Sequence, residues 1–191
     1  MKPNMEILDI VDESGSLTGR TVSREQAHRD GILHRTAHVW VIREKDGRTQ
    51  VLLQKRSTEK DSFPGMYDTS SAGHIPAGEE PLPSALRELQ EELGISAAPD
   101  ELHDAGTFRI QYEKVFHGRP FCDNEVCSVF VYREPVDIEC LTLQTSEVSE
   151  VRWFDLKEIR DEIERGDRHR LCVPAPGLQV LIGWLGNDIT R

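Results

Sequence analysis

The sequence predicts an α/β (α+β) fold, with strands and helices in a single domain over residues 1–191. Runs rich in β-branched and aromatic residues alternate along the chain with helical patterns. Internal repeats and low-complexity linkers, which would mark a domain boundary, are absent from the sequence. The length of 191 residues and a hydrophobic content of 37% allow one sizeable core.

The N-terminal 30 residues are expected to form a hairpin and a short helix. Apolar residues on either side of the turn-rich segment 12–16 predict two paired strands within residues 1–22. The polar segment Ser23–Arg29 predicts the helix that follows.

The middle of the chain predicts a second hairpin and then a long loop. Thr36–Ile42 and Gln50–Gln54 have the composition of strands, and Asp46-Gly47 supplies the turn between them. Ser57–Gly78 contains several helix breakers and has little periodicity, so we expect a functional loop there. The remaining expected elements are the helix Pro83–Leu93, the strands Phe108–Tyr112, Glu125–Tyr132 and Val151–Phe154, and the helices Leu156–Arg165 and Leu178–Leu185.

Charge and hydropathy exclude several classes of partner. The chain has 23 Lys and Arg against 34 Asp and Glu, a formal net charge of -11, which repels nucleic acids and anionic membranes and attracts divalent cations. No run approaches the roughly 18 apolar residues of a membrane span, and the N-terminus lacks the layout of a secretory signal, so we expect a cytoplasmic protein. The cysteines form no CxxC pair, and we expect buried reduced thiols at Cys122, Cys127, Cys140 and Cys172.

One predicted helix has a strongly acidic face. Pro81 near its start and Gly94 just beyond its last apolar residue define its ends. At about 100° per residue, four leucines share one face, and Glu88, Glu91 and Glu92 share the opposite face. A solvated face is the alternative interpretation, but no lysine compensates the like charges of Glu88 and Glu92, four residues apart.

The loop before this helix, Gly73–Glu80, contains three helix breakers and brings backbone close to the acidic face. Carboxylate and carbonyl oxygens are the ligands that hard divalent cations prefer, and Mg²⁺ keeps its remaining positions for water and substrate phosphates. Loop and helix together resemble the Nudix box, G-x5-E-x7-R-E-U-x-E-E-x-G-U, without a departure. The matching residues are Gly73, Glu79, Arg87, Glu88, Leu89, Glu91, Glu92, Gly94 and Ile95.

The resemblance implies a Nudix hydrolase fold, a mixed sheet sandwiched between helices, here with the N-terminal hairpin as an extension. It implies cleavage of a nucleoside diphosphate linked to another moiety, or of a similar organic pyrophosphate, with Mg²⁺ or Mn²⁺ as cofactor. A cation is needed because the diphosphate is anionic and repels the attacking water. The expected partner is a small pyrophosphate molecule, and we expect a monomer or a homodimer.

The box also implies residue roles. The implied metal ligands are three carboxylates and one backbone carbonyl, those of Glu88, Glu91, Glu92 and Gly73. Arg87 and Glu79 resemble the ion pair that orients the ligands. In the family the general base often lies outside the box, and Glu125 and Glu147 are the candidates here. For Glu147 the alternative is an exposed acid in a polar loop.

Outside the box, nearly the whole chain resembles the branch that contains isopentenyl-diphosphate isomerase. The supporting segments are the N-terminal hairpin and residues 33–37, 53–57, 63–65, 72–74 and 124–127. In that isomerase a cysteine before the Gly-His pair transfers a proton, whereas this chain has Ala72, which has no proton to give. We therefore expect a hydrolase. A prenyl-diphosphate enzyme, which Ala72 disfavours, and a nucleotide-binding regulator, which would usually lose box glutamates, are the alternatives.

The same isomerases hold a divalent metal with three histidines and two acids. The residues that resemble these ligands are His28, His34, His74, Asp123 and Glu125. Imidazoles with carboxylates suit Zn²⁺, Mn²⁺ or Fe²⁺, so a second transition metal is a candidate cofactor. Structural or surface histidines are the alternative, because His28 stands one residue closer to His34 than in the isomerase pattern. The histidines without an assigned role are His38, His103, His117 and His169.

Basic and aromatic residues before Gly73 are the candidates for substrate binding. Arginine and lysine hold terminal phosphates, and an aromatic ring stacks on a base. The candidates are Lys55, Arg56, Lys60, Phe63 and Tyr67. A solvated basic strand end beside a core phenylalanine is the alternative. For Tyr112, on the strand after the box, we expect packing in the core.

Overall fold

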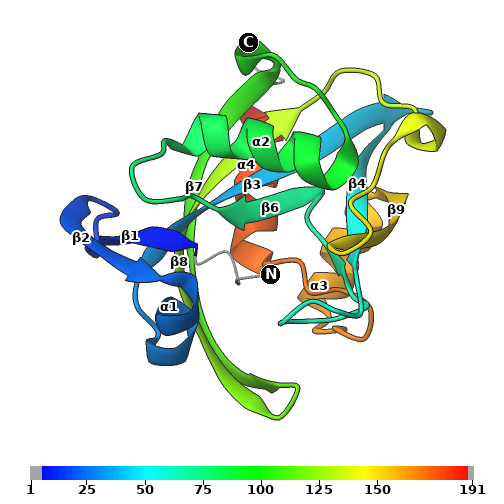
Figure 1. Cartoon of the computed structure of the whole chain (residues 1–191). Helices are drawn as coiled ribbons and strands as arrows, with labels where there is room; N and C mark the ends of the chain where they lie inside the picture. The colour runs from blue at the N-terminus through cyan, green and yellow to red at the C-terminus, as the bar shows by residue number, and fades with distance from the viewer. Residues whose placement is uncertain (1–5, 189–191) are drawn as a thin grey trace.

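The computed structural model describes residues 6–188 and contains two β-sheets (Figure 1). The strands are β1 (Ile7–Val11), β2 (Leu17–Ser23), β3 (His34–Lys45), β4 (Arg48–Arg56), β5 (Tyr67–Asp68), β6 (Ser71–His74), β7 (Leu102–Phe116), β8 (Arg119–Tyr132) and β9 (Val148–Asp155). The helices are α1 (Arg24–Asp30), α2 (Pro81–Leu93), α3 (Leu156–Glu164) and α4 (Ala175–Asp188), with 3-10 turns at η1 (Pro99–Glu101) and η2 (Ile138–Cys140).

The larger sheet is mixed. It has seven strands in the order β5-β4-β3-β8-β7, with β6 paired to β3 and β9 paired to β4, while β1 and β2 form a separate hairpin. The pair β3–β8 is parallel, and the pairs β3–β4, β3–β6 and β7–β8 are antiparallel. The central strand β3 therefore lies between β6 and β8, and β6 leads into α2.

Helices cover both faces of the large sheet, with α2 on one face and α4 on the other (Figure 1). On the α2 side, Leu89 and Leu93 pack in one buried cluster with Val39 of β3. On the other side, Trp40 of β3 packs in a second cluster with Ile159 of α3 and with residues of α4. Neighbouring residues of a strand point to opposite faces, so Val39 and Trp40 serve different cores. The expectation of a mixed sheet between helices is confirmed.

The N-terminal hairpin is fastened to the loop that precedes α2. The carbonyl of Ile7 accepts a hydrogen bond from the Ala77 N–H at 2.8 Å, and the Asp9 carboxylate accepts one from the Gly78 N–H at 2.8 Å. Arg35 of β3 pairs with the same carboxylate at 3.3 Å and donates to the carbonyl of Glu79 at 2.9 Å. The hairpin therefore helps to fix the course of the segment that enters α2.

The structure departs from the expected elements at two places. Ser57–Gly78 is not wholly a loop, because it contains the short strands β5 and β6, which are too short and too rich in small polar residues to show a strand pattern. The strands β7 and β8 continue into a long hairpin that projects from the body of the molecule (Figure 1). Its outer part is largely exposed, so its sequence lacks the alternation that burial of one face would impose.

The cysteines follow the prediction only in part. All four are free thiols, as expected, and Cys127 is buried. Cys140 is exposed, contrary to the expectation, because it lies in the turn η2, where its thiol contacts the Asp137 carboxylate at 3.4 Å. Over the described residues, no helix is long and apolar enough to cross a membrane.

Candidate active site and metal centres

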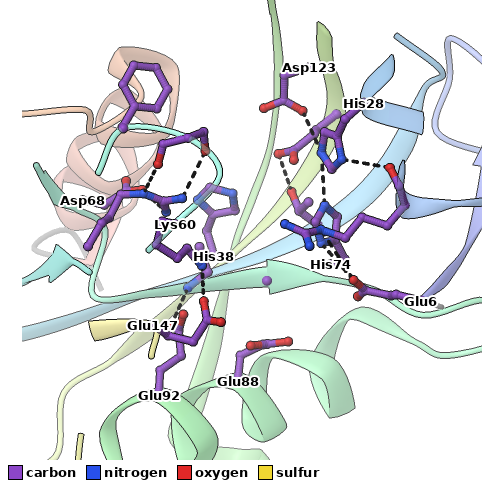
Figure 2. A pocket seen from close by; sticks show the side chains of 18 of the residues that line it. Glu6, His28, His38, Lys60, Asp68, His74, Glu88, Glu92, Asp123 and Glu147 are labelled. Atoms are coloured by element: carbon purple, nitrogen blue, oxygen red, sulfur yellow. Dashed lines mark hydrogen bonds and ion pairs between the residues drawn. The ribbon is translucent and has the colours of Figure 1, made fainter. Parts of the chain in front are cut away.

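A cavity of about 960 Å³ lies where α2, β3, β6 and β8 meet, and it brings most of the expected site residues together. Figure 2 shows Glu88 and Glu92 rising from α2 on one side and His28, His74 and Asp123 gathered on the other. The segment of β6 that includes Gly73 runs between the two groups. The cavity thus holds two clusters of metal-binding side chains.

The local sequence of α2 explains why its glutamates face the cavity. Pro81 is the first helical residue, and Gly94 ends the helix with φ 73°, where its N–H donates to the carbonyls of Leu89 and Gln90. Leucine side chains bury the opposite stripe. The register predicted from the sequence is therefore confirmed, and it places Glu88, Glu91 and Glu92 at the cavity.

The most deeply placed carboxylate of α2 is Glu92, with 3% of its surface exposed. It accepts hydrogen bonds from Gln54 Nε2 at 3.0 Å and from the Ala72 N–H at 3.2 Å. Burial raises the pKa of Glu92 to about 7, despite the opposing effect of Lys60. A cation at this position would stabilise the ionised form, so the carboxylate fits a metal ligand.

Close packing against Gly73 fixes the position of Glu88. A Cβ atom at Gly73 would lie 2.2 Å from Glu88 Cδ, so a side chain here would move this carboxylate from its position. Burial raises the pKa of Glu88, and Arg87 opposes this effect. The glycine of the motif is therefore required for the approach of backbone to carboxylate.

Arg87 does not form the ion pair expected with Glu79. Its guanidinium contacts Glu88 at 2.7 Å and Glu91 at 3.2 Å, and it donates to the carbonyl of His74 at 3.4 Å. Glu88, the next residue in α2, and Glu91, one helical turn later, lie closer to the Arg87 guanidinium than Glu79 before the helix. The Glu79 carboxylate instead accepts a hydrogen bond from Ser84 Oγ at 3.2 Å.

Three histidines and Glu125 form the second cluster, in which one ligand atom of each residue lies within 4.8 Å of the others. His28 Nδ1 donates to the carbonyl of Arg24 at 3.0 Å, and His34 Nδ1 donates to the carbonyl of Ile32 at 2.8 Å. Since a carbonyl only accepts, both rings carry a proton on Nδ1, and their Nε2 atoms are the ones available to the cluster.

The Nε2 atoms of the cluster face one another. His28 Nε2 lies 3.4 Å from His74 Nε2, and a Glu6 carboxylate oxygen lies 3.6 Å from His74 Nδ1 on the far side of that ring (Figure 2). Burial, followed by the charge of His34, lowers the pKa of His28 to about 4. Burial also lowers the pKa of His74. Neutral imidazoles with converging lone pairs are the form that binds a metal.

Asp123 lies beside this cluster, and both acids contact its histidines. Asp123 Oδ1 lies 3.6 Å from His28 Nε2, and Glu125 Oε1 lies 3.7 Å from His34 Nε2. Over residues 6–188, His34 Nε2 and Asp123 Oδ1 are buried and have no hydrogen-bond partner. Burial and then Glu125 raise the pKa of Asp123, while the facing histidines lower the pKa of Glu125 against the effect of burial. A metal ion would supply the missing partner, so all five residues fit a transition-metal site.

The second candidate for general base, Glu147, also lines the cavity. It forms an ion pair with Lys60, which lies on the loop after β4. Glu147 is half-buried in the polar loop before β9. Lys60 and Glu147 thus contact each other in the cavity wall near Glu92 (Figure 2).

The candidates for substrate binding separate into two groups. Arg56 and Phe63 line the cavity, and Arg56 pairs with Asp68 at 3.1 Å. Lys55 and Tyr67 are not among the described residues that line it; they are cross-strand partners on the far face of β4 and β5, where both contact Glu150. The structure places these two residues away from the cavity, because alternate residues of β4 point to opposite faces.

Tyr112 and His38 are among the residues of the cavity wall that sequence reasoning missed. Tyr112 pairs across the β7–β8 ladder with Asp123 and lines the cavity, although core packing was expected. Burial, followed by Asp123, raises the pKa of Tyr112. His38, which had no assigned role, lines the same cavity from β3. The alternation that continues from Phe108 through Ile110 predicts that Tyr112 points inward, but not that the core opens there.

A second cavity, of about 1280 Å³, adjoins the first and shares Glu6, Arg24, His28 and Phe121 with it. Its wall is strongly charged and includes Phe116 of the projecting hairpin. The other charged residues in its lining are Glu25, Arg29, Glu59, Asp61 and Arg119.

Comparisons with known proteins give consistent results. The family model described as the NUDIX domain matches residues 32–173. Nudix hydrolase 3 of Arabidopsis thaliana is 41% identical over 164 residues, which are 85% of this chain but 21% of that protein, so the chain spans about a fifth of this relative. An uncharacterized Nudix hydrolase of Clostridium acetobutylicum is 40% identical over 81% of this chain and 72% of that protein.

An isopentenyl-diphosphate Delta-isomerase of Dinoroseobacter shibae is 31% identical over 76% of this chain and 77% of that protein. Among solved structures, a Deinococcus radiodurans protein has a TM-score of 0.67 at 19% identity and covers 92% of this chain and 97% of that chain. This structural likeness supports the fold alone.

Proposed function

The chain belongs to the Nudix hydrolase family, and we propose that it cleaves the diphosphate linkage of a nucleoside diphosphate derivative or a similar organic pyrophosphate with the help of Mg²⁺ or Mn²⁺. Pyrophosphate hydrolysis in general follows from the family. The observation that carries the proposal is the set of three glutamates on the cavity face of α2, next to Gly73, where a side chain would meet the Glu88 carboxylate.

The donor set of α2 fits a hard divalent cation. Glu88 and Glu92 are held where burial disfavours their charge, and Glu91 lies at the cavity rim. These carboxylates, with the carbonyl of Gly73, would hold Mg²⁺ or Mn²⁺. When bound, the ion supplies neutralisation of the diphosphate oxygens and lowers the pKa of the attacking water.

The chain's own residues supply orientation, phosphate binding and a base. Arg87 holds Glu88 and Glu91 in place through its ion pairs. Lys60 and Arg56 face the cavity and bind phosphate oxygens. Glu147 accepts the proton of the attacking water once phosphate draws Lys60 away from it, and Glu125 is the other candidate base.

A second metal site at the histidine cluster is part of the proposal. The imidazoles of His28, His34 and His74, with Asp123 and Glu125, suit Zn²⁺, Mn²⁺ or Fe²⁺ better than Mg²⁺. Two buried polar atoms without a hydrogen-bond partner among residues 6–188, His34 Nε2 and Asp123 Oδ1, support this assignment.

The adjoining cavity offers groups that suit a nucleoside derivative. Its lining combines arginines with the aromatic rings of Phe116 and Phe121, which suit phosphate oxygens and a base. Ala72 offers no acid or base for isomerisation. The intact set of box glutamates disfavours a regulator that binds without cleavage. We also propose one domain and a cytoplasmic monomer or homodimer that acts on small molecules rather than nucleic acids or membranes.

The test is a substrate screen with purified protein in Mg²⁺ and in Mn²⁺. Nucleoside diphosphates, nucleoside diphosphate sugars, dinucleotides and prenyl diphosphates are incubated, and release of phosphate and nucleoside monophosphate is followed. We expect cleavage of a nucleotide derivative and no conversion of isopentenyl to dimethylallyl diphosphate. Isomerisation at enzyme-like rates would overturn the argument from Ala72 and favour the prenyl-diphosphate alternative.

A further inference from the structure

His38 is a buried polar side chain of the cavity wall that the proposed reaction leaves without a role. It belongs to β3, has 7% of its surface exposed, and lines the cavity between the two metal-binding clusters. Figure 2 shows it between Asp68 on one side and the His28 and His74 pair on the other. Within residues 6–188, no hydrogen bond to its ring is formed.

The neighbours of His38 already have other partners. Asp68 accepts from Arg56 at 3.1 Å and from the Thr69 N–H at 2.8 Å, and Glu125 Oε2 accepts from Thr36 Oγ1 at 3.0 Å. Phe108 packs edge-on against the ring of His38, with ring centroids 5.3 Å apart. One side of the imidazole is therefore held by packing, and a ring nitrogen lies within 4.8 Å of a Glu125 carboxylate oxygen and of Cys127 Sγ without a hydrogen bond to either.

The strand register sets the direction of this side chain. His38 is the cross-strand partner of Ala72, so both side chains lie on the same face of the sheet. The N–H of Ala72 donates to Glu92, which places this pair next to the acidic face of α2. Ala72 and His38 point to the face opposite to Gly73, whose Cβ position meets Glu88, and both residues line the cavity.

We propose that His38 binds the substrate directly, by donating a hydrogen bond from its imidazole to a phosphoryl oxygen of the diphosphate. The assignment rests on the proposed function, because it takes the diphosphate to lie in front of α2. An imidazole carries at least one N–H donor whether it is neutral or charged, so the role does not depend on its protonation. Arg56 and Lys60 hold the charge of the phosphates, and His38 fixes their orientation.

The experiment measures binding of imidodiphosphate, a non-hydrolysable analogue of diphosphate, by calorimetry with and without Mg²⁺. His38→Gln keeps an N–H donor, whereas His38→Met keeps a similar volume without one. We expect His38→Met to weaken Mg²⁺-dependent binding by about tenfold or more, and His38→Gln to stay within about threefold of the wild type. His169→Gln, at an exposed position away from the cavity, is the matched control.

Each other outcome counts against a defined part of the proposal. Equal binding by the wild type and His38→Met, while Glu91→Gln abolishes it, overturns the role of His38 and leaves the proposed function standing. Equal losses in both His38 variants overturn the donor role in favour of ring packing. Loss of transition metal from His38→Met makes His38 a part of the histidine cluster and overturns the proposal. Absence of Mg²⁺-dependent binding by the wild type contradicts both proposals.

Discussion

The acidic face of α2 and the histidine cluster face the same cavity but balance their charges differently. On α2, Arg87 pairs with Glu88 and Glu91, and Glu92 accepts two hydrogen bonds from the protein. In the histidine cluster, His34 Nε2 and Asp123 Oδ1 are buried without a hydrogen-bond partner in the described part of the chain. The carboxylates of α2 thus interact with other protein groups, whereas the histidine cluster leaves two buried polar atoms without a hydrogen bond.

This difference predicts how tightly each site holds a metal ion. Carboxylates that have protein partners tolerate loss of a cation, so α2 suits an ion that exchanges with solution. Buried acceptors without partners are costly, so the histidine cluster should hold its metal tightly. The segment Ala72–Gly73–His74 touches both sites, which makes it the place where the two can be separated by mutation.

The largest effect is expected from Glu92→Gln. It removes a charged oxygen from the α2 site and should lower turnover by on the order of a hundredfold or more. The near-isosteric side chain should leave folding and the metal content of the histidine cluster unchanged. Steady-state rates with circular dichroism and elemental analysis check this. Full turnover in the folded variant would mean that the acidic face is not catalytic.

His74→Ala should affect the other site. We expect the transition-metal content to fall from about one ion per chain to near zero, because one of three imidazole ligands is lost. Elemental analysis of protein purified without chelators measures it, with His169→Ala as the control at an exposed position. A wild-type protein without stoichiometric Zn, Mn, Fe, Co or Ni would leave the histidines as structural residues.

A smaller effect concerns stability of the metal-free protein as a function of pH. The pKa of Glu92 is raised from 4.5 to about 7, so the native state binds more protons than the unfolded state between these values. The free energy of unfolding contributed by this group should therefore fall as pH rises through that window, by about 3 kcal/mol in total.

Urea unfolding of the wild type and Glu92→Gln at pH 4.5, 6 and 8 isolates this contribution. As pH rises, the free energy of unfolding of the wild type should fall relative to that of Glu92→Gln. Mg²⁺ should restore the stability that the wild type loses. A pH-independent difference would contradict the burial of an ionisable Glu92 in the metal-free cavity.

The smallest predicted effect is that of Glu6→Gln. Its carboxylate lies behind His74 Nδ1, where it favours the tautomer with a free Nε2. Replacement should weaken transition-metal binding by about tenfold without abolishing it. Competition with a chelator of known affinity provides the measurement, and an unchanged affinity would show that the Glu6 contact does not orient the ring.

The two sites also differ in how far sequence predicted them. Pro81, Gly94 and the leucine spacing were enough to define α2 and the direction of its glutamates, because helix periodicity is local. The partners of Arg87 were not predictable, since they depend on side-chain positions rather than on spacing. The histidine cluster assembles from α1, β3, β6 and β8, so composition and periodicity alone do not reveal it.

The same reasoning applies to the fold. The first hairpin and the central strands were predicted from turns and β-branched residues, while β5 and β6 were missed because they exist through pairing with β4 and β3. Lys55 and Tyr67 were misplaced because the sequence does not show which face of a strand borders a cavity.

The central claim is that hydrolysis depends on a divalent ion held by α2, and the most direct test is the rate of nucleoside monophosphate release against free Mg²⁺. The measurement uses the best substrate of the screen and protein freed of metal with EDTA, which is then removed. We predict background rates without added metal, a saturable rise with Mg²⁺, and recovery that Glu92→Gln does not share. Full activity in excess EDTA, or no hydrolysis of any nucleotide derivative at saturating Mg²⁺, would contradict the claim.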